Sequence, residues 1–542
     1  MKHGRKILGA AIGSDVHVAG LLNFLRVAEA EGLETAYLGG AVSIDKLVEE
    51  IDRTKPDVVA ISYRLGAEAL ERLLGRLKGK MQLSRIKPTF IFGGTMETAA
   101  VARKSKFFDR IFDGSEEIED VVMYLRGSVK RAKGELPPQT LPERIEYKSP
   151  YPLVRHHIGL PTKEETEREI AALAKSGLLD IISLAPDQNC QQYFFEPEKM
   201  DPRQDGAGGA PIRTVGDFKR LYQASRRGNY PLMRCYAGTN HLVEFSKLLK
   251  ETLNNAWAAI PIFWYSDLDR RSERELLLAI RENMEAIRWN AEHGVPVEVN
   301  DSHQWELRYA HDAVGVAVAY IAAHVAKGLG VKWYVQQYML NTPPTLSPRM
   351  DLAKAIAKME LVESLADEHF IPYRMIRTGL LSMPADEDAG KGQLVSSMFY
   401  GSYLKPHIIH VVAYCEAFRR ATSKEIIESV KMVRRAYSEA MKGLPDFAAD
   451  SGIRSRVNQL KEEAMEIVEA IKALGYSADT DPLLNPEVLY EAVKRGMLDA
   501  PGLVGFSVAK GEVKTRTIDG AIYAVDEEGD PITEKERLVK LR

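Results

Sequence analysis

The sequence predicts an α/β protein with a doubly wound parallel sheet, a following (β/α)8 barrel and a small α+β appendage. Three observations indicate this fold class. Short apolar segments alternate with amphipathic helical segments over residues 1–127, about seven further strand and helix repeats fill residues 151–476, and a hairpin pattern occurs within residues 477–542. Alternating strands and helices are typical of parallel sheets, and a long series of such units is typical of a barrel.

The first predicted domain, residues 1–127, contains five short apolar segments that predict parallel strands. These are residues 7–12, 34–38, 58–62, 89–93 and 110–112, and a helical segment at residues 118–125 follows them. The pattern is typical of a flavodoxin-like domain of the Rossmann type. In such folds, ligands bind outside the carboxyl ends of the strands.

Residues 128–150 differ in composition from the segments on either side. They are basic, contain the pair Pro137 and Pro138, and have few apolar positions. Polar, proline-containing segments of this kind are typical of linkers. We therefore expect an interdomain linker here, long enough for the first domain to move.

Residues 151–476 repeat strand-like and helical segments. The expected strands are residues 180–184, 232–235, 259–264, 297–300, 333–337, 373–376 and 407–412, and the expected helices include residues 165–176, 273–292, 310–327 and 351–366. Gly294 and Gly328 lie where the second and third of these helices should end. A barrel of this kind carries its active site at the carboxyl ends of its strands.

The predicted C-terminal appendage, residues 477–542, contains two segments of alternating polarity. They cover residues 513–518 and 521–525, and the pair Asp519 and Gly520 separates them. An Asp-Gly pair between such segments is a strong signal for a tight hairpin. We therefore expect a small α+β unit at this end of the barrel domain.

Composition favours small-molecule chemistry. The 542 residues carry a formal net charge of −3 with acids and bases interspersed, which argues against partners such as nucleic acid or an anionic membrane. The three cysteines are far apart and form no Cys-x-x-Cys pair, so neither a disulfide framework nor a thiolate zinc site is expected. There is no long apolar segment, and we expect a cytoplasmic protein.

A loop bounded by glycines, residues 13–20, follows the first strand and carries Asp15 and His17. An imidazole that binds a metal through one nitrogen needs an acceptor for its other nitrogen, and Asp15 lies two residues away. Gly20, which lacks a Cβ, lets a bulky group pass close to the backbone where the next helix begins. The spacing therefore predicts that His17 ligates a metal beside a large ligand.

The spacing Asp-x-His-x-x-Gly resembles the cobalamin-binding signature of mutases and corrinoid methyltransferases. The resemblance implies that His17 replaces the vitamin's own base below the cobalt. It also implies that Ser62, at the end of the third strand, bonds the displaced dimethylbenzimidazole. The pair Gly93 and Gly94 would let the backbone approach the nucleotide tail.

The predicted cofactor-binding residues lie at three strand ends, with His17 as the metal ligand. They are Ser14, Asp15, Val16, His17, Gly20, Ser62, Arg64, Leu65, Gly93 and Gly94. The family often has leucine two residues after the serine, whereas this chain has Arg64 there and Leu65 next. The alternative interpretation is an ordinary flavodoxin-like domain with a surface His17, whose ligand crevice would lie at the same strand ends.

A corrinoid domain followed by a barrel resembles the two components of glutamate mutase (methylaspartate mutase) joined in one chain. The likeness covers the first 125 residues and continues in the barrel around residues 152–155, 180–187, 231–234 and 384–387. In that family three arginines clamp the two substrate carboxylates, a task suited to the planar guanidinium. The resemblance implies that Arg155 and Arg234 are two of these arginines.

Two other family positions differ in this chain. Residues 189–193 carry neutral side chains where the third arginine is expected, and residues 254–259 contain no acid where the family's glutamate receives the substrate ammonium. We therefore expect a substrate with fewer charges than glutamate. The residues expected to recognise it are Gln191, Gln192, Tyr265 and Asp267, and residues 301–304 form a further polar cluster behind a strand.

Together these observations predict an adenosylcobalamin-dependent radical isomerase, a carbon-skeleton mutase that acts on a small carboxylic acid other than glutamate. A methylcobalamin-dependent methyltransferase is an alternative, because it would use the same histidine to shuttle a methyl group. A non-catalytic corrinoid carrier or sensor is a third interpretation. The family likeness also implies a homodimer formed through the barrel.

Overall fold

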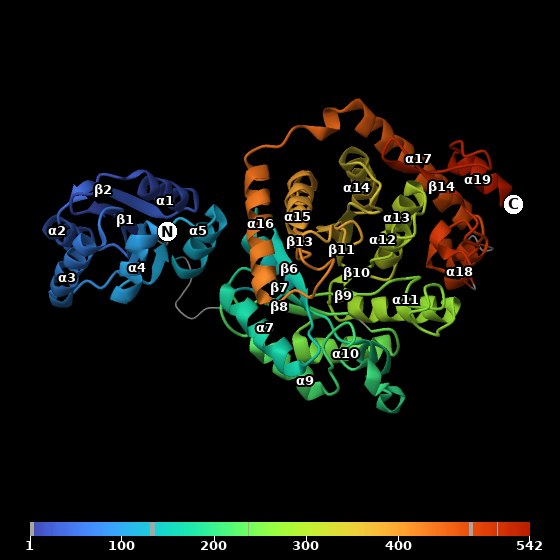
Figure 1. Cartoon of the computed structure of the whole chain (residues 1–542), viewed down its shortest axis with the longest axis horizontal. Coiled ribbons are helices and arrows are strands. Elements are labelled where there is room, and N and C mark those ends of the chain that lie inside the picture. The colour runs from blue at the N-terminus through green and yellow to red at the C-terminus, as the bar shows by residue number, and fades with distance from the viewer. Residues whose placement is uncertain (1–4, 130–135, 237, 476–480, 507, 542) are drawn as a thin grey trace. The chain divides into compact units, whose positions relative to one another are not determined.

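The computed structural model describes residues 5–129, 136–236, 238–475, 481–506 and 508–541 (Figure 1). The chain divides into two compact units, Met1–Pro137 and Pro138–Arg542. Each unit is described by itself below. Among the helices of the described residues, none is both long enough and apolar enough to cross a lipid bilayer.

The first unit is a five-stranded parallel sheet with the strand order β2-β1-β3-β4-β5. Its strands are β1 (Lys6–Ile12), β2 (Glu34–Val42), β3 (Val58–Tyr63), β4 (Thr89–Gly94) and β5 (Arg110–Phe112). Its helices are α1 (Ala19–Ala30), α2 (Ile44–Thr54), α3 (Ala67–Leu83), α4 (Met96–Ser105) and α5 (Ile118–Tyr124). The predicted fold is confirmed, and each observed strand lies within a few residues of its predicted range.

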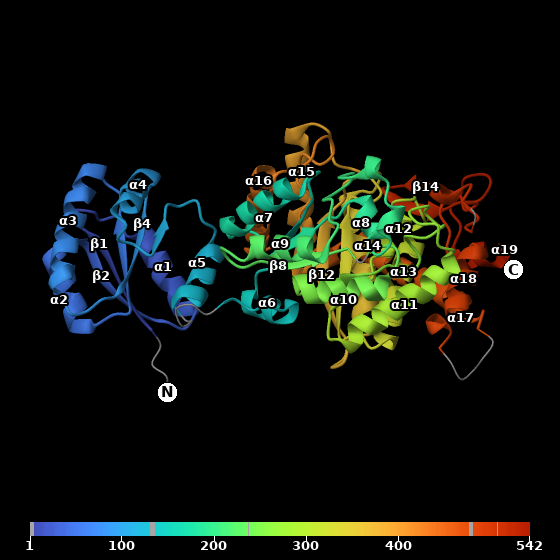
Figure 2. The same ribbon diagram turned by 90° about the horizontal axis from the view of Figure 1, so that it is seen from below.

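Both faces of this sheet are covered because buried residues alternate along the central strands. Leu8 and Val59 belong to one apolar cluster, with α2, α3 and α4, whereas Ile7 and Val58 belong to another, with α1 and α5. Figure 2 shows the helices on the two sides of the sheet. Strands buried on both faces are expected in a doubly wound fold.

The second unit contains an eight-stranded parallel barrel in chain order. Its strands are β6 (Leu153–Ile158), β7 (Ile181–Leu184), β8 (Leu232–Cys235), β9 (Ala258–Ala259), β10 (Val297–Glu298), β11 (Trp333–Leu340), β12 (Ile371–Thr378) and β13 (Ile408–His410). The first and last strands pair, with Leu153 beside Ile408. The barrel closes between β8 and β9, where the Ala256 N–H, just before β9, donates to the Met233 carbonyl of β8 at 2.8 Å.

Helices alternate with the barrel strands as predicted. They are α7 (Lys163–Ser176), α8 (Gln188–Tyr193), α9 (Val215–Ser225), α10 (Leu242–Leu253), α11 (Leu276–Glu292), α12 (Ser302–Glu306), α13 (Asp312–Gly328), α14 (Pro348–Glu363), α15 (Glu387–Gly401) and α16 (Ser423–Met441). Gly294 adopts a positive φ of 67° just beyond α11, whereas Gly330 with φ 88° follows α13 instead of Gly328. The barrel fold is confirmed, with β6 as a strand additional to those predicted.

The base of the barrel is sealed by a short helix from the segment predicted as a linker. Helix α6 (Leu141–Lys148) places Leu141 in an apolar cluster with residues from the lower ends of the strands, including Leu153, Leu232 and Ile408. Lys148 forms a buried ion pair with Asp180. This part of residues 128–150 is therefore part of the barrel unit, and the pocket-forming end of the barrel is the opposite one.

The C-terminal residues pack onto the barrel. Helix α17 (Ser451–Lys472) contacts α13 and α14, and α18 (Pro486–Lys494), β14 (Thr515–Ile518), β15 (Ala521–Ala524) and α19 (Glu534–Lys540) follow. Strands β14 and β15 pair antiparallel around Asp519 and Gly520, which both have positive φ, as the hairpin signal predicts. Leu489 of α18 and Leu538 of α19 share one apolar core with the barrel helices.

Candidate functional site

The loop after β1 holds His17 against a buried carboxylate. Asp15 is completely buried, and its Oδ1 accepts the His17 backbone N–H at 2.9 Å and contacts His17 Nδ1 at 2.7 Å. Its Oδ2 accepts the Arg64 backbone N–H at 2.6 Å. Asp15 therefore ties the His17 loop to the end of β3.

This geometry leaves one imidazole nitrogen of His17 for a ligand. With Nδ1–H donating to Asp15, Nε2 carries the lone pair, and the carboxylate increases its basicity. The His17 side chain is 55% exposed, so its outer nitrogen is accessible. The arrangement matches the donor set that a metal-binding histidine requires, and the aspartate predicted as its partner is in place.

A cavity of about 420 Å³ opens between α1 and the carboxyl ends of β3, β4 and β5. Five predicted residues line it, namely Gly20, Ser62, Arg64, Gly93 and Gly94. A Cβ built on Gly20 or Gly93 would meet no atom within 4 Å, so both glycines widen the space available to a ligand. The cavity size and the open backbone suit the elongated tail of a nucleotide-bearing cofactor.

The other predicted cofactor residues surround the His17 loop. Ser14 and Val16 are exposed, Val16 to 66%, and Leu65 is exposed beside Arg64. Exposed Val16, next to His17 in the chain, and exposed Leu65, next to Arg64, offer apolar contact to a flat macrocycle. Arg64 contributes its backbone N–H to Asp15, so the residue that departs from the family pattern still supports His17.

The two adjacent glycines of β4 have different roles, which predicts opposite mutational effects. A Cβ on Gly94 would lie 2.7 Å from the Tyr63 carbonyl oxygen, whereas one on Gly93 would enter the cavity. We expect Gly94→Ala to destabilise the domain by about 1–3 kcal/mol through overpacking. We expect Gly93→Val to leave stability nearly unchanged and to weaken cobalamin binding about tenfold. Thermal unfolding and cobalamin titration of both variants measure this, and equal effects of the two changes would contradict it.

A second candidate site lies inside the barrel, near the carboxyl ends of its strands. A pocket of about 390 Å³ is lined by cationic and other polar side chains. They are Arg155 and His157 of β6, Arg234 of β8, Tyr236, Tyr265, Arg271, Glu298 of β10, Asn300, His303, Gln304, Gln337 of β11, Arg377 of β12 and His410 of β13. The apolar residues Leu307, Met339, Leu380 and Leu381 complete the lining.

Strand alternation explains why these side chains meet. Leu153 belongs to the apolar base of the barrel, and Arg155 and His157 follow it at every second position of β6. In β12, Tyr373 and Met375 belong to the same base, and Arg377 is the next inward position. Layers of inward-facing residues are a general feature of such barrels, and here the upper layers are polar.

The pocket holds more positive than negative charge. Arg155 and Arg234 are each 1% exposed, and both guanidinium groups lie over the Trp257 ring, at 5.3 and 5.0 Å from its centroid. Glu298 is the one acid among the described residues that line the pocket, and it lies 3.9 Å from Arg155 and accepts the Trp257 indole N–H at 2.7 Å.

Several of the guanidinium donors in the pocket have no hydrogen-bond partner within the described part of the chain. They are Nε of Arg155, Nε and Nη2 of Arg234, and Nε of Arg377. Burial and the Arg234 charge lower the pKa of Arg155 from its ordinary value, although a guanidinium stays protonated at neutral pH. Buried guanidinium donors without a hydrogen-bond partner are costly, so their presence indicates a site for an anionic ligand.

The pocket histidines are neutral. Burial, together with the nearby arginines, holds the pKa values of His157, His303 and His410 well below the usual histidine value. The hydrogen bonds agree with this protonation state. Arg155 donates to His410 Nε2 at 3.4 Å, His410 Nδ1 contacts Gln337 Oε1 at 3.3 Å, and Gln337 Nε2 contacts His303 Nδ1 at 3.1 Å. The histidines thus add dipoles and no positive charge.

Of the barrel residues that the sequence suggested, three lie in the pocket and three do not. Arg155, Arg234 and Tyr265 line it, and burial raises the pKa of Tyr265 to about 12, so its hydroxyl remains a donor. Gln191 donates to the Pro186 carbonyl at 2.8 Å. Gln192 and Asp267 line a separate surface pocket of about 800 Å³ next to Arg271. The polar cluster at residues 301–304 contributes His303 and Gln304.

The loops above the barrel depend on a buried carboxylate whose titration can be tested. Asp301 is completely buried and accepts the backbone N–H groups of Ile262 at 2.6 Å and Phe263 at 2.9 Å. Burial raises the pKa of Asp301 to about 7, above the value of 3.8 expected for the unfolded chain. The folded state therefore holds this proton more tightly, and its stability falls as the pH rises from about 4 to 7.

We expect Asp301→Asn to flatten that decline by on the order of 2 kcal/mol, because the amide cannot ionise. Urea unfolding of the full chain at pH 4.5, 5.5, 6.5 and 7.5 measures it. Asp386→Asn, which changes a carboxylate at an exposed helix cap, serves as the control. An unchanged pH dependence in Asp301→Asn would contradict the prediction.

Comparison with known proteins supports the first site. Residues 5–122 match the family model described as the B12 binding domain. No curated protein matches the chain.

Solved structures show partial likeness. One is a crystal structure of a novel cobalamin-binding protein from Desulfitobacterium hafniense DCB-2, with 25% identity and a TM-score of 0.18 over 20% of this chain and 52% of that one, so the match spans about half of that protein. Another is a truncated 3-deoxy-D-arabino-heptulosonate 7-phosphate synthase from Thermotoga maritima, with 9% identity and a TM-score of 0.32 over 54% and 89%. A third is the cobalamin-dependent S-adenosylmethionine radical enzyme OxsB with aqua-cobalamin bound, with 9% identity and a TM-score of 0.20 over 94% and 77%.

The domain match and the His17 geometry coincide within residues 5–122, and this part of the chain is a B12-binding domain.

Proposed function

We propose that the chain is an adenosylcobalamin-dependent carbon-skeleton mutase of the glutamate mutase type, with a small carboxylic acid as substrate. The observation that carries the proposal is a combination within one chain. A B12-binding domain presents His17 on a buried aspartate, and a barrel pocket presents buried arginines without enough acids to balance them.

The residues of the B12-binding domain fit cobalamin bound through a protein histidine. When bound, adenosylcobalamin supplies a carbon-centred radical by homolysis of its cobalt–carbon bond. His17 would hold the cobalt through Nε2, and Asp15 would keep the imidazole in the required tautomer. Ser62, Gly93 and the surrounding cavity would hold the nucleotide tail.

The residues of the barrel pocket fit a carboxylate substrate. Arg155, Arg234 and Arg377 offer guanidinium donors that lack partners, and carboxylates accept such donors in pairs. Radical chemistry needs a substrate that is held still and protected from water. Fixed arginines on barrel strands and the apolar rim of Leu307, Leu380 and Leu381 are suited to that task.

Glutamate itself belongs among the acids to be tested. The sequence argued against it because no third arginine and no acid occupied the family positions. Arg377 of β12 and Glu298 of β10 bring both kinds of group into the pocket from other strands. The pocket therefore offers groups for an amino dicarboxylic acid as well as for a substrate with fewer charges.

Electron paramagnetic resonance tests the proposal. The full chain is mixed with adenosylcobalamin and with small mono- and dicarboxylic acids, glutamate and acyl thioesters in turn. We expect a coupled cobalt(II)–radical signal with one of the acids. The optical absorption spectrum of cobalt(I) after methyl transfer from methylcobalamin would favour the methyltransferase alternative. Cobalamin binding without turnover of any acid would favour a carrier or sensor.

A further inference from the structure

The last residues of the chain contact the two loops that carry pocket residues. The loop after β10, residues 299–311, provides Asn300, His303 and Gln304 to the barrel pocket, and the loop after β9, residues 260–275, provides Tyr265 and Arg271. The C-terminal segment, defined here as residues 481–506 and 508–541, lies against both loops within the same unit.

Contacts to the loop after β10 are concentrated at its end. The Gly502 N–H donates to the Arg308 carbonyl at 3.1 Å, and the Thr515 hydroxyl donates to the Tyr309 carbonyl at 2.8 Å. Arg308 in turn donates to the Gln304 carbonyl at 2.8 Å and lies 4.2 Å from the centroid of a Trp264 ring. A line of direct contacts thus runs from the C-terminal segment to a pocket residue.

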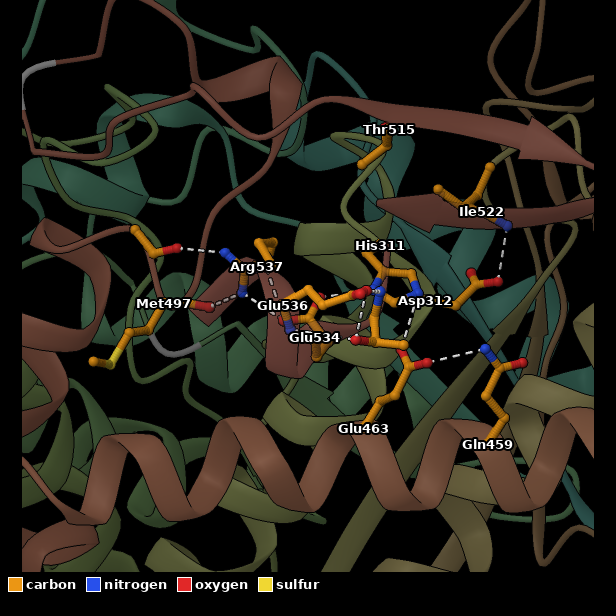
Figure 3. Close-up of polar contacts among 12 residues, drawn as sticks. His311, Asp312, Gln459, Glu463, Met497, Thr515, Ile522, Glu534, Glu536 and Arg537 are labelled. Atoms are coloured by element: carbon orange, nitrogen blue, oxygen red, sulfur yellow. Dashed lines mark hydrogen bonds and ion pairs between the residues drawn. The ribbon is translucent and has the colours of Figure 1, made fainter. Parts of the chain in front are cut away.

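His311 is the central contact of this loop. It is 1% exposed, and its Nδ1 lies 2.7 Å from Glu534 Oε1 of α19. On its other side, Nε2 lies 3.5 Å from Glu463 Oε2 of α17. Figure 3 shows the imidazole between the two carboxylates, with Arg537 on the far side of Glu534. Arg537 donates to Glu534 Oε2 at 2.8 Å. Burial raises the pKa of Glu534, but Arg537 and His311 together outweigh it and lower this pKa to about 2.

The next residue, Asp312, fixes the first turn of α13. Its Oδ2 accepts the Ile522 N–H of β15 at 3.0 Å and an Arg456 guanidinium N–H of α17 at 3.0 Å. Arg308, Tyr309, His311 and Asp312 therefore all contact the C-terminal segment. The buried ion pairs Asp312–Arg456 and Glu534–Arg537 each hold one geometry, because moving one member leaves a charge without its partner.

The loop after β9 is held by a weaker contact. Arg270 donates to the Gly505 carbonyl at 2.7 Å and lies 4.6 Å from the centroid of the Phe506 ring. Its neighbour Arg271 lines the barrel pocket. The same segment of chain therefore reaches both pocket-forming loops.

We propose that Glu534 is a positioning residue for the barrel pocket. Through its contact with His311, Glu534 holds the loop that carries His303 and Gln304. Among the described residues, the side chain of Glu534 forms its polar contacts with His311 and Arg537, neither of which lines the pocket. The inference rests on the proposed function, which makes the pocket a carboxylate-binding site. The order of the loop can be measured without a substrate.

Hydrogen–deuterium exchange of the full chain tests the proposal without a ligand. Glu534→Gln keeps the shape of the side chain and removes its charge, and Glu528→Gln makes the same change at an exposed position of the same segment. We expect Glu534→Gln to raise exchange in residues 299–311 at least tenfold, with β11 and β12 unchanged, and Glu528→Gln to match the native protein. Unchanged exchange in residues 299–311, or equal acceleration in β11 and β12, would overturn the positioning role.

Binding of glutarate, a simple dicarboxylate probe, adds a second measurement. We expect Glu534→Gln to weaken glutarate binding about five- to tenfold in calorimetric titration, and Glu528→Gln to leave it unchanged. A native protein that binds no glutarate would count against the proposed carboxylate site, whereas the exchange result would still decide the positioning role.

If Glu534→Gln does not fold, Glu534→Asp decides. This variant keeps the buried charge and shortens the side chain that reaches His311 Nδ1. Faster exchange confined to residues 299–311 supports the positioning role, and its absence overturns it.

Discussion

Replacing His17 by alanine is expected to abolish the coupling of cobalt to a histidine nitrogen in the paramagnetic resonance spectrum of bound cobalt(II) cobalamin. The buried Asp15 orients Nε2 of His17 outward, and removal of the imidazole leaves the cobalt without its protein ligand. We expect the affinity for cobalamin to fall by about 10- to 100-fold, because the cavity beside Gly93 still holds the tail. Labelling histidine with ¹⁵N and titrating cobalamin measure both effects.

Two further variants separate ligation from general damage. Asp15→Asn retains the imidazole but weakens the hydrogen bond that orients it. We therefore expect a smaller loss of cobalamin affinity and a nitrogen coupling that is altered but retained. His369→Ala removes a histidine that is exposed in the barrel unit and serves as the control. Native coupling to ¹⁵N-labelled histidine in His17→Ala would show that another histidine binds the cobalt, and the assignment of the site would then fail.

Replacing Arg234 by methionine is expected to make the barrel more stable and the pocket inactive. Arg234 is buried beside Arg155, and two of its donor nitrogens lack partners among the described residues. Removing such a charge for an apolar side chain of similar length should stabilise the folded state by about 1–3 kcal/mol. The same change should reduce kcat/KM for the carboxylic acid substrate by about 100- to 1000-fold, since a buried charge partner is lost.

Calorimetry of the ligand-free protein and steady-state kinetics measure the two effects. Arg220→Met provides the control, because Arg220 is half exposed and pairs with Glu167 on the outside of the barrel. We expect the control to change neither stability nor activity appreciably. A destabilised Arg234→Met with normal kinetics would show that the arginine is structural, and the pocket would lose its proposed role.

The local sequence patterns predict the residues of the His17 site better than those of the barrel pocket. The His17 loop and its glycines are contiguous or lie at strand ends whose order the apolar segments already indicate, so sequence reasoning placed all of them at one edge of the sheet. The barrel pocket depends on which residues of each strand point inward. Arg377 was missed because the apolar segment ended at Ile376, although β12 continues to Thr378 and the alternation from Tyr373 and Met375 pointed to it.

Other features could not be predicted, either because polar residues break the apolar pattern of a strand or because the contacts join distant residues. Strand β6 carries Arg155, His156 and His157, so it lacks the apolar pattern of a buried strand although all its residues are at least partly buried. Glu298 ends the two-residue strand β10, where a lone acid gives no sequence signal. The contacts of His311 with Glu463 and Glu534 join residues more than 150 positions apart, a separation beyond any local pattern.

Three of the four guanidinium groups that line the barrel pocket lie on strands, and only Arg271 lies on a loop above them. Arg155, Arg234 and Arg377 belong to β6, β8 and β12, whose spacing is fixed by backbone pairing around the barrel. Loop rearrangement alone cannot widen the gap between these groups. An acid one or two methylenes longer or shorter than the native substrate should therefore bind poorly, and a change of chain-length preference would require exchanging inward-facing strand residues.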